Sequence, residues 1–360
     1  MIEQFSRTQA VIEDGFRRRL HHGVQIYVSL ESNTLLDAAM SSESRQPTLD
    51  KNSIMLWRSA GKPLTAALAL LFANRQQLDI DQPLSTWIDE SMGSVVGEIT
   101  LRDLLAHRSG LPVVDTGWPQ SGWSEIIRRI VSISQLTTTA AYQPQLSWFL
   151  IADVLQRIDG RPFRQLIRDE LLQPLQMDRS WCGLPDEILR QQSDRIAGLF
   201  DRQKGQLVDH ALNDSQARRS PSPGGSFRGA VSDLARFYEW LGGQFVPSST
   251  DLPADEIRSA MTEPTRVGQF DETLQHTIDF GLGVILNSNR YGQETVPYGF
   301  GKYSSDAAFG HGGAQCAMGF CDPTFGLVVA WAADGLCGEG WHQRRNKAIH
   351  EAIYEDLGLC

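Results

Sequence analysis

The sequence has 360 residues, of which 41% are hydrophobic and 21% charged, and this is enough apolar material for a sizeable core that needs neither disulfides nor a metal ion. At roughly 100–200 residues per domain, the length predicts two or three structural units or one elaborated domain. Acidic residues outnumber basic ones by 43 to 33, and the net charge of −10 argues against nucleic acid or an anionic membrane as a partner, because phosphate groups bind to basic faces.

The N-terminal part of the sequence predicts a helix, a few strands and a second, longer helix. Apolar residues recur at helical spacing over residues 3–20 and again over 60–74. Between them, residues 24–30 and 35–40 have the pattern of two strands joined by a turn, and 54–57 that of a short third strand. We therefore expect the long helix to follow directly after the first strands of a sheet.

The middle of the sequence, residues 100–230, predicts mainly helices. Residue types that cap helix N-termini precede several apolar segments, and we expect a helix to begin after each of them. These candidate caps are Thr100, Ser124, and Ser232 or Asp233.

The C-terminal part returns to strands, predicted at 280–286, 315–322 and 326–334, and ends in a helix over about 341–357. Strands at both ends with helices between them favour a sheet domain that is built from the two ends of the chain. An inserted helical domain then fills the middle.

Composition also bears on compartment and cofactors. The first residues lack the apolar segment and cleavage site of a secretory signal, and the five cysteines are an odd number without a Cys-x-x-Cys pair, so we expect free thiols in a reducing cytoplasm. The longest apolar run, residues 64–73, is too short to span a bilayer. The eight histidines form no His-Glu-x-x-His motif or Cys/His cluster, so we expect neither a metal nor another cofactor.

One short motif at the start of the long helix carries chemistry. Ser59 and Lys62 are three residues apart, one helical turn, so the amine can reach the hydroxyl. A serine hydroxyl becomes a nucleophile when a neighbouring base takes its proton, and a desolvated lysine can be that base. Pro63 fits only the first helical turn, which places the helix start near Ser59. On this motif alone, a solvent-facing Ser and Lys is the alternative.

Further segments make the interpretation specific. The Ser59–Lys62 motif resembles the nucleophile helix of the serine β-lactamase and penicillin-binding-protein superfamily. The branch is the class C β-lactamase-like one, which includes class VIII esterases, D-aminopeptidases and acyltransferases. Three other segments are similar to this branch in kind and in order: Thr100–Pro112, Gly224-Gly225-Ser226 with the helix from Ser232 to Phe237, and Gly310–Ala314 with Gly319-Phe320 and Asp322-Pro323.

The resemblance implies a third catalytic residue. The branch carries Tyr-x-Asn before a helix that ends in glycine, and counting back from Gly160 places Tyr142 at the tyrosine. Tyr142 would then share or relay the serine proton, with a packing tyrosine as the alternative. Pro144 stands where the family has Asn and cannot donate a side-chain hydrogen bond, so Gln143 or Gln145 is expected to make the substrate contact instead.

His311 stands where penicillin-recognising enzymes most often have the Lys of Lys-Thr-Gly. A neutral histidine holds a substrate carboxylate weakly, which argues against a β-lactamase or DD-peptidase and favours an esterase, amidase or acyltransferase. Gly312 and Gly313 let the strand approach the acyl group closely. The resemblance implies an oxyanion hole from the backbone N–H groups of Ser59 and Ala314. We expect His311 to orient the leaving group or the acceptor.

The roles of one histidine and of three tryptophans are ambiguous. His107 is a candidate general base for Ser59. In this branch, however, the segment that contains this histidine is a packing segment, so we expect His107 to have a structural role. The tryptophans around the helical part, Trp118, Trp123 and Trp148, are candidates for the walls of an apolar acyl pocket, with core packing as the alternative.

The resemblance implies a fold of the β-lactamase/transpeptidase type, α/β plus all-α, in which an antiparallel sheet is flanked by terminal helices. We expect residues 1–60 and 265–360 to form the sheet lobe and 61–264 the helical lobe, with the active-site cleft between them.

The expected function is that of a serine hydrolase, esterase-like, which acts on a small-molecule ester or amide through a covalent acyl-enzyme. A biosynthetic acyltransferase with the same Ser-Lys-Tyr residues is an alternative, and so are a D-aminopeptidase or β-lactamase and a non-catalytic scaffold protein. The sequence leaves the oligomeric state and the acyl group open.

Overall fold

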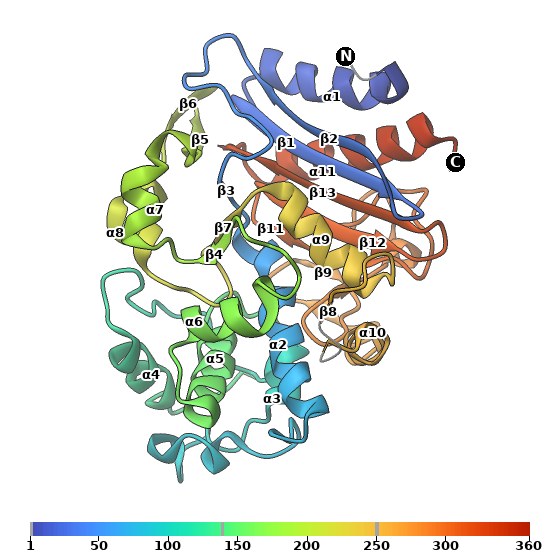
Figure 1. Cartoon of the computed structure of the whole chain (residues 1–360). Coiled ribbons are helices and arrows are strands. Elements are labelled where there is room, and N and C mark those ends of the chain that lie inside the picture. The colour runs from blue at the N-terminus through green and yellow to red at the C-terminus, as the bar shows by residue number, and fades with distance from the viewer. Residues whose placement is uncertain (1–2, 138–139, 249–251) are drawn as a thin grey trace.

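The computed structural model describes residues 3–137, 140–248 and 252–360. Its centre is a six-stranded antiparallel sheet in the order β10-β11-β12-β13-β1-β2 (Figure 1). The strand β1 (Gly23–Leu30) pairs with β13 (Leu327–Ala333), so that Val28 lies opposite Val329. The sheet is therefore assembled from the two ends of the chain, as the sequence predicts. The other strands of this sheet are β2 (Asn33–Ser41), β10 (Ile285–Leu286), β11 (Phe309–Gly313) and β12 (Ala317–Asp322).

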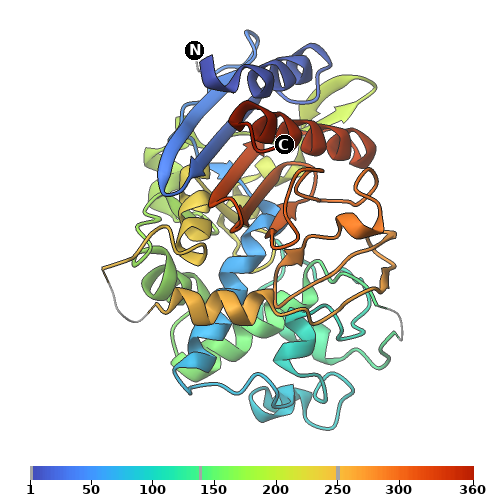
Figure 2. The ribbon, with the colours of Figure 1, turned by 90° about the vertical axis from the view of Figure 1, so that its right-hand side faces the viewer.

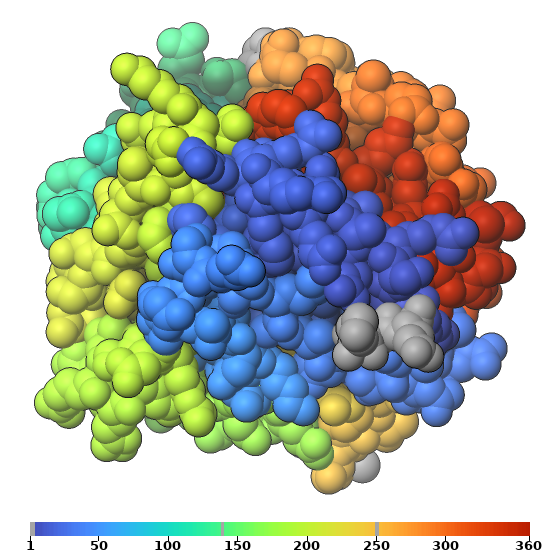
Figure 3. Space-filling model, turned by 90° about the horizontal axis from the view of Figure 1, so that it is seen from above, coloured from blue at the N-terminus to red at the C-terminus, as the bar shows by residue number. Residues whose placement is uncertain are grey.

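Two terminal helices cover one face of the sheet. The helices α1 (Ser6–Arg17) and α11 (Glu339–Leu357) pack on each other and lie above the strands in Figure 2, and in the view from above in Figure 3 the blue N-terminal and the red C-terminal parts of the chain lie side by side. The Thr8 hydroxyl donates a hydrogen bond to the Asp356 carboxylate at 2.8 Å, which ties the two helices together. Alternate β1 residues such as Ile26 contribute to the apolar cluster beneath them.

The opposite face of the sheet is covered by α9 (Val231–Leu241). The Glu239 carboxylate of this helix accepts hydrogen bonds from the Tyr27 and Ser29 hydroxyls of β1, at 2.7 and 2.8 Å. Strand alternation explains the arrangement, since Tyr27 and Ser29 point away from the terminal helices. The helix α9 lies within residues 61–264, the stretch expected to form the helical lobe, yet it packs on the sheet.

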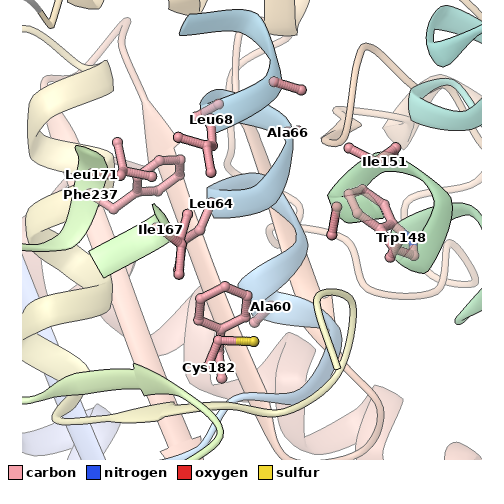
Figure 4. Close-up of a cluster of buried hydrophobic side chains, with 14 of the residues drawn as sticks. Ala60, Leu64, Ala66, Leu68, Trp148, Ile151, Ile167, Leu171, Cys182 and Phe237 are labelled. Atoms are coloured by element: carbon pink, nitrogen blue, oxygen red, sulfur yellow. The ribbon is translucent and has the colours of Figure 1, made fainter. Parts of the chain in front are cut away.

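The long predicted helix is the core of the molecule. A short 3-10 turn, η2 (Arg58–Gly61), leads into α2 (Lys62–Asn74), whose residues from Lys62 to Phe72 are all buried. A helix that is apolar on every side must be surrounded. Figure 4 shows Leu64 and Leu68 of α2 beside Ile167, Leu171 and Phe237, while Trp148 and Ile151 lie on the other side of the helix.

Shorter elements complete the helical part and the flanks. The segment between α10 and β11, orange in Figure 2, runs along one flank beneath α11 and has few regular elements. The remaining helices are α3 (Leu101–Leu105), α4 (Trp123–Val131), α5 (Leu146–Asp159), α6 (Phe163–Ile167), α7 (Asp186–Gln191), α8 (Ser215–Arg219) and α10 (Ala254–Thr262). The small sheets consist of β3 (Met55–Leu56), β7 (Phe227–Gly229) and β4 (Ser180–Cys182); of β14 (Gly335–Leu336), β5 (Phe200–Gln203) and β6 (Gln206–Asp209); and of β8 (Phe270–Asp271) and β9 (His276–Thr277).

Of the predicted helix caps, one is confirmed and the others are wrong. Thr100 forms a capping box with Asp103 at the start of α3. The helix α4 begins at Trp123, one residue before the expected cap Ser124. Likewise, α9 begins at Val231, because Ser232 and Asp233 have other partners: the Arg179 guanidinium donates to both side chains and so ties β4 to this helix.

The strand predicted over 280–286 is correct only at its end, where β10 forms. Gly281 and Gly283 turn the chain before it: the Gly281 N–H bonds the Val284 carbonyl, and Gly283 has a φ of 77°. Among the described residues, no helix is both long and apolar enough to cross a membrane.

Candidate active site

Ser59 and Lys62 meet where η2 passes into α2. The Lys62 Nζ atom lies 2.9 Å from Ser59 Oγ, so the predicted contact between the two side chains is present. Arg58, directly before the serine, has a left-handed φ of 48°, a conformation that costs a non-glycine residue roughly 1–2 kcal/mol. Such strain is common where a chain must present a functional side chain.

Two backbone carbonyls hold the Lys62 amine in place. Pro144 O lies at 2.8 Å and Gly224 O at 2.6 Å from Nζ, and both can only accept hydrogen bonds. When the amine is neutral, its two N–H groups are therefore used by the carbonyls and its lone pair faces the Ser59 hydroxyl. Burial lowers the pKa of Lys62 well below its usual value, which favours this neutral form. The geometry is that of a base beside a nucleophile.

The Gly-rich segment supplies one of these carbonyls because it approaches α2 closely. A Cβ on Gly224 would lie 2.6 Å from the Trp148 ring, so only glycine fits here. The Thr65 hydroxyl fixes the same segment by donating to the Pro223 carbonyl at 2.7 Å. Pro144 contacts Lys62 through its main-chain carbonyl, so this contact does not depend on the side chain at the position.

Tyr142 lies against the same pair. Lys62 Nζ is 5.3 Å from the centre of the Tyr142 ring, and the His107 ring packs against the tyrosine with 4.5 Å between ring centres. Burial raises the pKa of Tyr142, and a side-chain hydrogen bond with Ser59 opposes that rise only in part. The residue is thus a neutral phenol beside the serine, able to pass a proton rather than to hold a negative charge.

The strand β11 lies directly beside η2. A Cβ on Gly313 would be 2.0 Å from the Trp57 carbonyl oxygen, and one on Gly312 would be 2.2 Å from the Tyr298 ring. Both glycines are therefore required for this close approach. Ala314 follows them and lines the same cavity as Ser59, which is the arrangement that an oxyanion hole made of these two N–H groups needs.

His311 is buried on β11 and is uncharged. Burial lowers the pKa of His311 to about 3. Its Nδ1 atom lies 2.8 Å from the Gly312 carbonyl oxygen, so this nitrogen carries the proton. The other nitrogen, Nε2, is then an acceptor without a partner among the described residues. A hydroxyl or amine that enters the site could donate a hydrogen bond to it.

A cavity of about 450 Å³ opens above the serine. Its lining is mostly apolar, with a few polar groups, as in small-molecule sites. The lining residues come from η2, the loop before α5, the segment between α10 and β11, β11 with the residue after it, and the start of α11. They are Ser59, Tyr142, Thr273, Leu274, Gln275, Ile285, Pro297, Tyr298, His311, Gly312, Ala314, Glu339 and Gln343.

Two predicted substrate contacts lie elsewhere. The Gln143 amide is fully used inside the protein: its Nε2 donates to the Leu111 and Pro112 carbonyls, and its Oε1 accepts from the N–H groups of Gln145 and Leu146. It therefore has no group left for a substrate. Trp148 lies behind Lys62, with its ring centre 5.3 Å from Nζ, and its indole N–H donates to the Gln143 carbonyl, so it shields the amine from water.

His107 supports this arrangement from below. Its Nδ1 accepts a hydrogen bond from the Gln143 N–H at 3.0 Å, and its ring is buried behind Tyr142, outside the residues that line the cavity. Both contacts fit the structural role expected for this histidine.

The outer part of the cavity is what sequence reasoning missed. A buried ion pair between Arg266 and Asp271 anchors it, and the Asp271 carboxylate also accepts the N–H groups of Thr273 and Leu274. These residues carry no motif, and Glu339 is merely an acidic residue in the first turn of a helix. Only an Asx turn at Asp271 was available as a signal.

No group of three or more His, Cys, Asp or Glu side chains in the described parts of the chain is placed to hold a metal ion.

Solved structures share the fold over nearly the whole chain. A family VIII carboxylesterase is 19% identical with a TM-score of 0.79, and the alignment covers 98% of each chain. EstCE1, described as a hydrolase with promiscuous acyltransferase activity, is 17% identical with a TM-score of 0.80, covering 98% of this chain and 99% of the other.

A sequence relative and a family model complete the comparison. The esterase/beta-lactamase LipL of Mycobacterium tuberculosis is 24% identical over 131 residues, which is 35% of this chain and 30% of LipL, so the match spans under a third of that relative. The model of the beta-lactamase family matches residues 9–353. The chain therefore belongs to the beta-lactamase family, whose members are serine hydrolases.

Proposed function

We propose that the protein is an esterase-like serine hydrolase that acts on a small-molecule ester or amide through an acyl-enzyme on Ser59. The observation that carries this proposal is the wholly buried Lys62 amine, held by two carbonyls with its third position 2.9 Å from the serine hydroxyl. A lysine that is buried only for packing has no need of a serine at that position.

In the first step, Ser59 Oγ attacks the substrate carbonyl carbon and forms a C–O bond. Its proton passes to Lys62 Nζ, directly or through the Tyr142 hydroxyl, and the oxyanion accepts hydrogen bonds from the Ser59 and Ala314 N–H groups. Collapse of the tetrahedral intermediate breaks the bond to the leaving group, which takes the proton from Lys62.

In the second step, the oxygen of water or of another acceptor attacks the acyl carbon while Lys62 Nζ takes its proton; the bond from the acyl carbon to Ser59 Oγ then breaks, and Oγ takes the proton back from Lys62. The free Nε2 of His311 would orient the acceptor by accepting a hydrogen bond from its O–H. With a pKa of about 3, His311 is a poor base, so orientation is the role that we propose.

Transfer to an alcohol is the second candidate. It is supported by the apolar lining of the cavity, which suits an organic acceptor, and by the acyltransferase activity in the description of EstCE1. A β-lactamase or D-aminopeptidase fits less well, because the neutral His311 provides no fixed charge for a substrate carboxylate.

The test is labelling with a fluorophosphonate and with a p-nitrophenyl ester, read as a mass shift on the Ser59 peptide. We expect stoichiometric labelling of the wild type and of the control variant Ser109→Ala, whose hydroxyl only accepts a turn hydrogen bond from the Leu111 N–H. Ser59→Ala should lose the label, and label retained there would overturn the proposal, as would an unlabelled wild type. Added alcohols separate transfer from hydrolysis, and a chromogenic cephalosporin tests the β-lactamase alternative.

We also propose a cytoplasmic location for the protein. All five cysteines are free thiols, and four of them are buried, a state that a reducing compartment preserves. Fractionation of the native host, with activity measured in each fraction, tests this location.

A further inference from the structure

The active-site cavity contains a carboxylate without a cationic partner. Glu339, in the first turn of α11, lines the cavity, and none of the described residues that line this cavity is Lys or Arg. Its carboxylate accepts hydrogen bonds from the Tyr298 hydroxyl at 3.1 Å and from Gln315 Nε2 at 3.1 Å. Both donors are neutral, so they orient the negative charge without compensating it.

The nearest arginines in the sequence are engaged elsewhere. Arg345 points its guanidinium at the carbonyls of Leu20, Gln315 and Gly335. Arg344 lies over the Trp341 ring, 5.1 Å from its centre. Glu339 takes part in no ion pair within the described chain, and its charge is open to a ligand in the cavity.

The rest of the lining also suits a cation. Tyr298 and Tyr142 present aromatic rings to the cavity, and ring faces attract ammonium groups. The backbone of Tyr298 has a left-handed φ of 55°, and its ring packs on Gly312, so the position of this ring is fixed by the chain. Leu274, Ile285 and Pro297 provide apolar surface for methyl or methylene groups.

The opposite wall does not repel a cation. His311 is neutral, and Lys62 is enclosed by Pro144, Gly224 and Trp148 rather than exposed to the cavity. A neutral histidine at this position is therefore compatible with a positively charged substrate, whereas a lysine would oppose it.

We propose that this cavity selects substrates that carry an ammonium group, tertiary or quaternary, which Glu339 and the ring of Tyr298 bind while the scissile carbonyl lies at Ser59. This inference rests on the proposed function, because it names the substrate class of the same site. It identifies Glu339 as the residue that determines specificity.

Binding tests the inference without any turnover. Choline and 3,3-dimethylbutan-1-ol have the same shape and differ in the charge of one central atom. Titration calorimetry on the wild type should give a dissociation constant at least about tenfold lower for choline, the size of effect that a cation–π contact and a partly desolvated ion pair provide. Glu339→Gln should remove most of this difference.

A matched control separates local from overall charge. Glu187→Gln, at an exposed position on α7, changes the net charge of the protein by the same amount and should leave the choline preference intact. A ratio of dissociation constants within about twofold in the wild type, or one that Glu339→Gln leaves unchanged, would overturn the inference.

Turnover then distinguishes this inference from the proposed function. Acetylcholine and 3,3-dimethylbutyl acetate test the alcohol side, and ethyl betainate and ethyl 3,3-dimethylbutanoate test the acyl side. We expect kcat/KM to favour the charged member in at least one pair by about tenfold. Hydrolysis of the neutral esters without that preference overturns the inference and leaves the proposed function standing, while choline binding without hydrolysis of any ester does the reverse.

Discussion

The two ends of the active-site cavity are built in different ways. At the inner end, Ser59, Lys62 and Tyr142 are fixed by buried backbone and aromatic contacts, and Lys62 has a partner for each of its hydrogen-bonding positions. At the outer end, Thr273 lies on the loop between β8 and β9 and Glu339 lies at the start of α11, and both residues are exposed. The inner end can thus hold a reaction constant while substitutions at the outer end change the substrate.

The substitution Lys62→Met removes the proposed base from the inner end of the cavity and retains an unbranched side chain of similar length. We expect kcat/KM for a p-nitrophenyl ester to fall by about 10²–10⁴-fold, the usual contribution of a general base. The control Lys302→Met removes a lysine that contacts Glu351, at 3.8 Å, and the Tyr303 ring, neither of which lines the cavity, and should change the rate little.

The pH dependence of the same reaction has a defined sign. Acylation needs the deprotonated amine, so the rate should rise with pH through the folded-state pKa of Lys62, which burial lowers from 10.5. Lys62→Met should lose this ascending limb. A variant that keeps the limb, or more than a tenth of the wild-type rate, would show that another group is the base.

The outer end depends on a buried ion pair that can be broken separately. Arg266 and Asp271 have fully buried side chains, and Arg266→Met leaves the carboxylate without its charge partner. We expect the free energy of unfolding in urea to fall by about 3–5 kcal/mol. The double variant Arg266→Met/Asp271→Asn should recover part of this loss, since the isolated charge is gone.

A surface pair is the control for this effect. Arg102→Met breaks the exposed contact with Asp81 and should change the free energy of unfolding by at most about 1 kcal/mol. Equal effects of Arg102→Met and Arg266→Met would contradict the distinction between the buried and the exposed pair.

Gly313→Ala tests how closely β11 must approach the nucleophile. The added methyl group would lie 2.0 Å from the Trp57 carbonyl oxygen, so the strand has to move away from Ser59. A displacement of about 1 Å at a reacting group lowers the rate by roughly 100-fold, and we expect kcat/KM to fall by about this factor. Gly122→Ala, where a Cβ would meet nothing within 4 Å, is the matched control and should retain activity.

The low pKa of His311 makes the stability of the protein depend on pH. Its pKa is about 3 in the folded protein against 6.5 for the free side chain, so below pH 6.5 the unfolded chain binds more protons than the folded one. The protein should lose stability as the pH falls from 6.5 towards 3, by up to about 1.4 kcal/mol per pH unit from this residue. In urea unfolding at several pH values, His311→Gln should show a shallower loss; an unchanged slope would mean that His311 is charged in the folded protein.

The sequence predicts the inner end far better than the outer end. Ser59, Lys62 and Gly313 lie in motifs whose residue types are fixed by chemistry or by close packing, and the Ser59–Lys62 contact is made within one helical turn. The sheet is likewise predictable, because β1 and β13 are short and largely apolar, as is typical of strands that are buried on both faces. The resemblance of the sequence to the family also predicts the order in which these segments occur along the chain.

The outer end could not be predicted because it depends on tertiary contacts between distant segments. Gln143 is a predicted substrate contact, but its amide donates hydrogen bonds to the Leu111 and Pro112 carbonyls instead. No spacing in the sequence indicates these partners. Ser232 and Asp233 have the residue types of helix caps, yet Arg179 recruits both. In each case a polar side chain binds a partner that lies far away in the sequence.

The pairing of β1 with β13 also affects how the enzyme is made. Val24 pairs with Ala333, about 300 residues later, so β1 leaves the ribosome long before its partner exists. At about 5–20 residues per second, the wait is roughly 15–60 s, during which an unpaired strand edge is open to aggregation and to chaperones. Strand β11 is synthesised in the same late period, so a nascent chain that ends before β11 cannot align Ser59 with the proposed oxyanion hole, and we expect the serine to stay inert until β11 has been made.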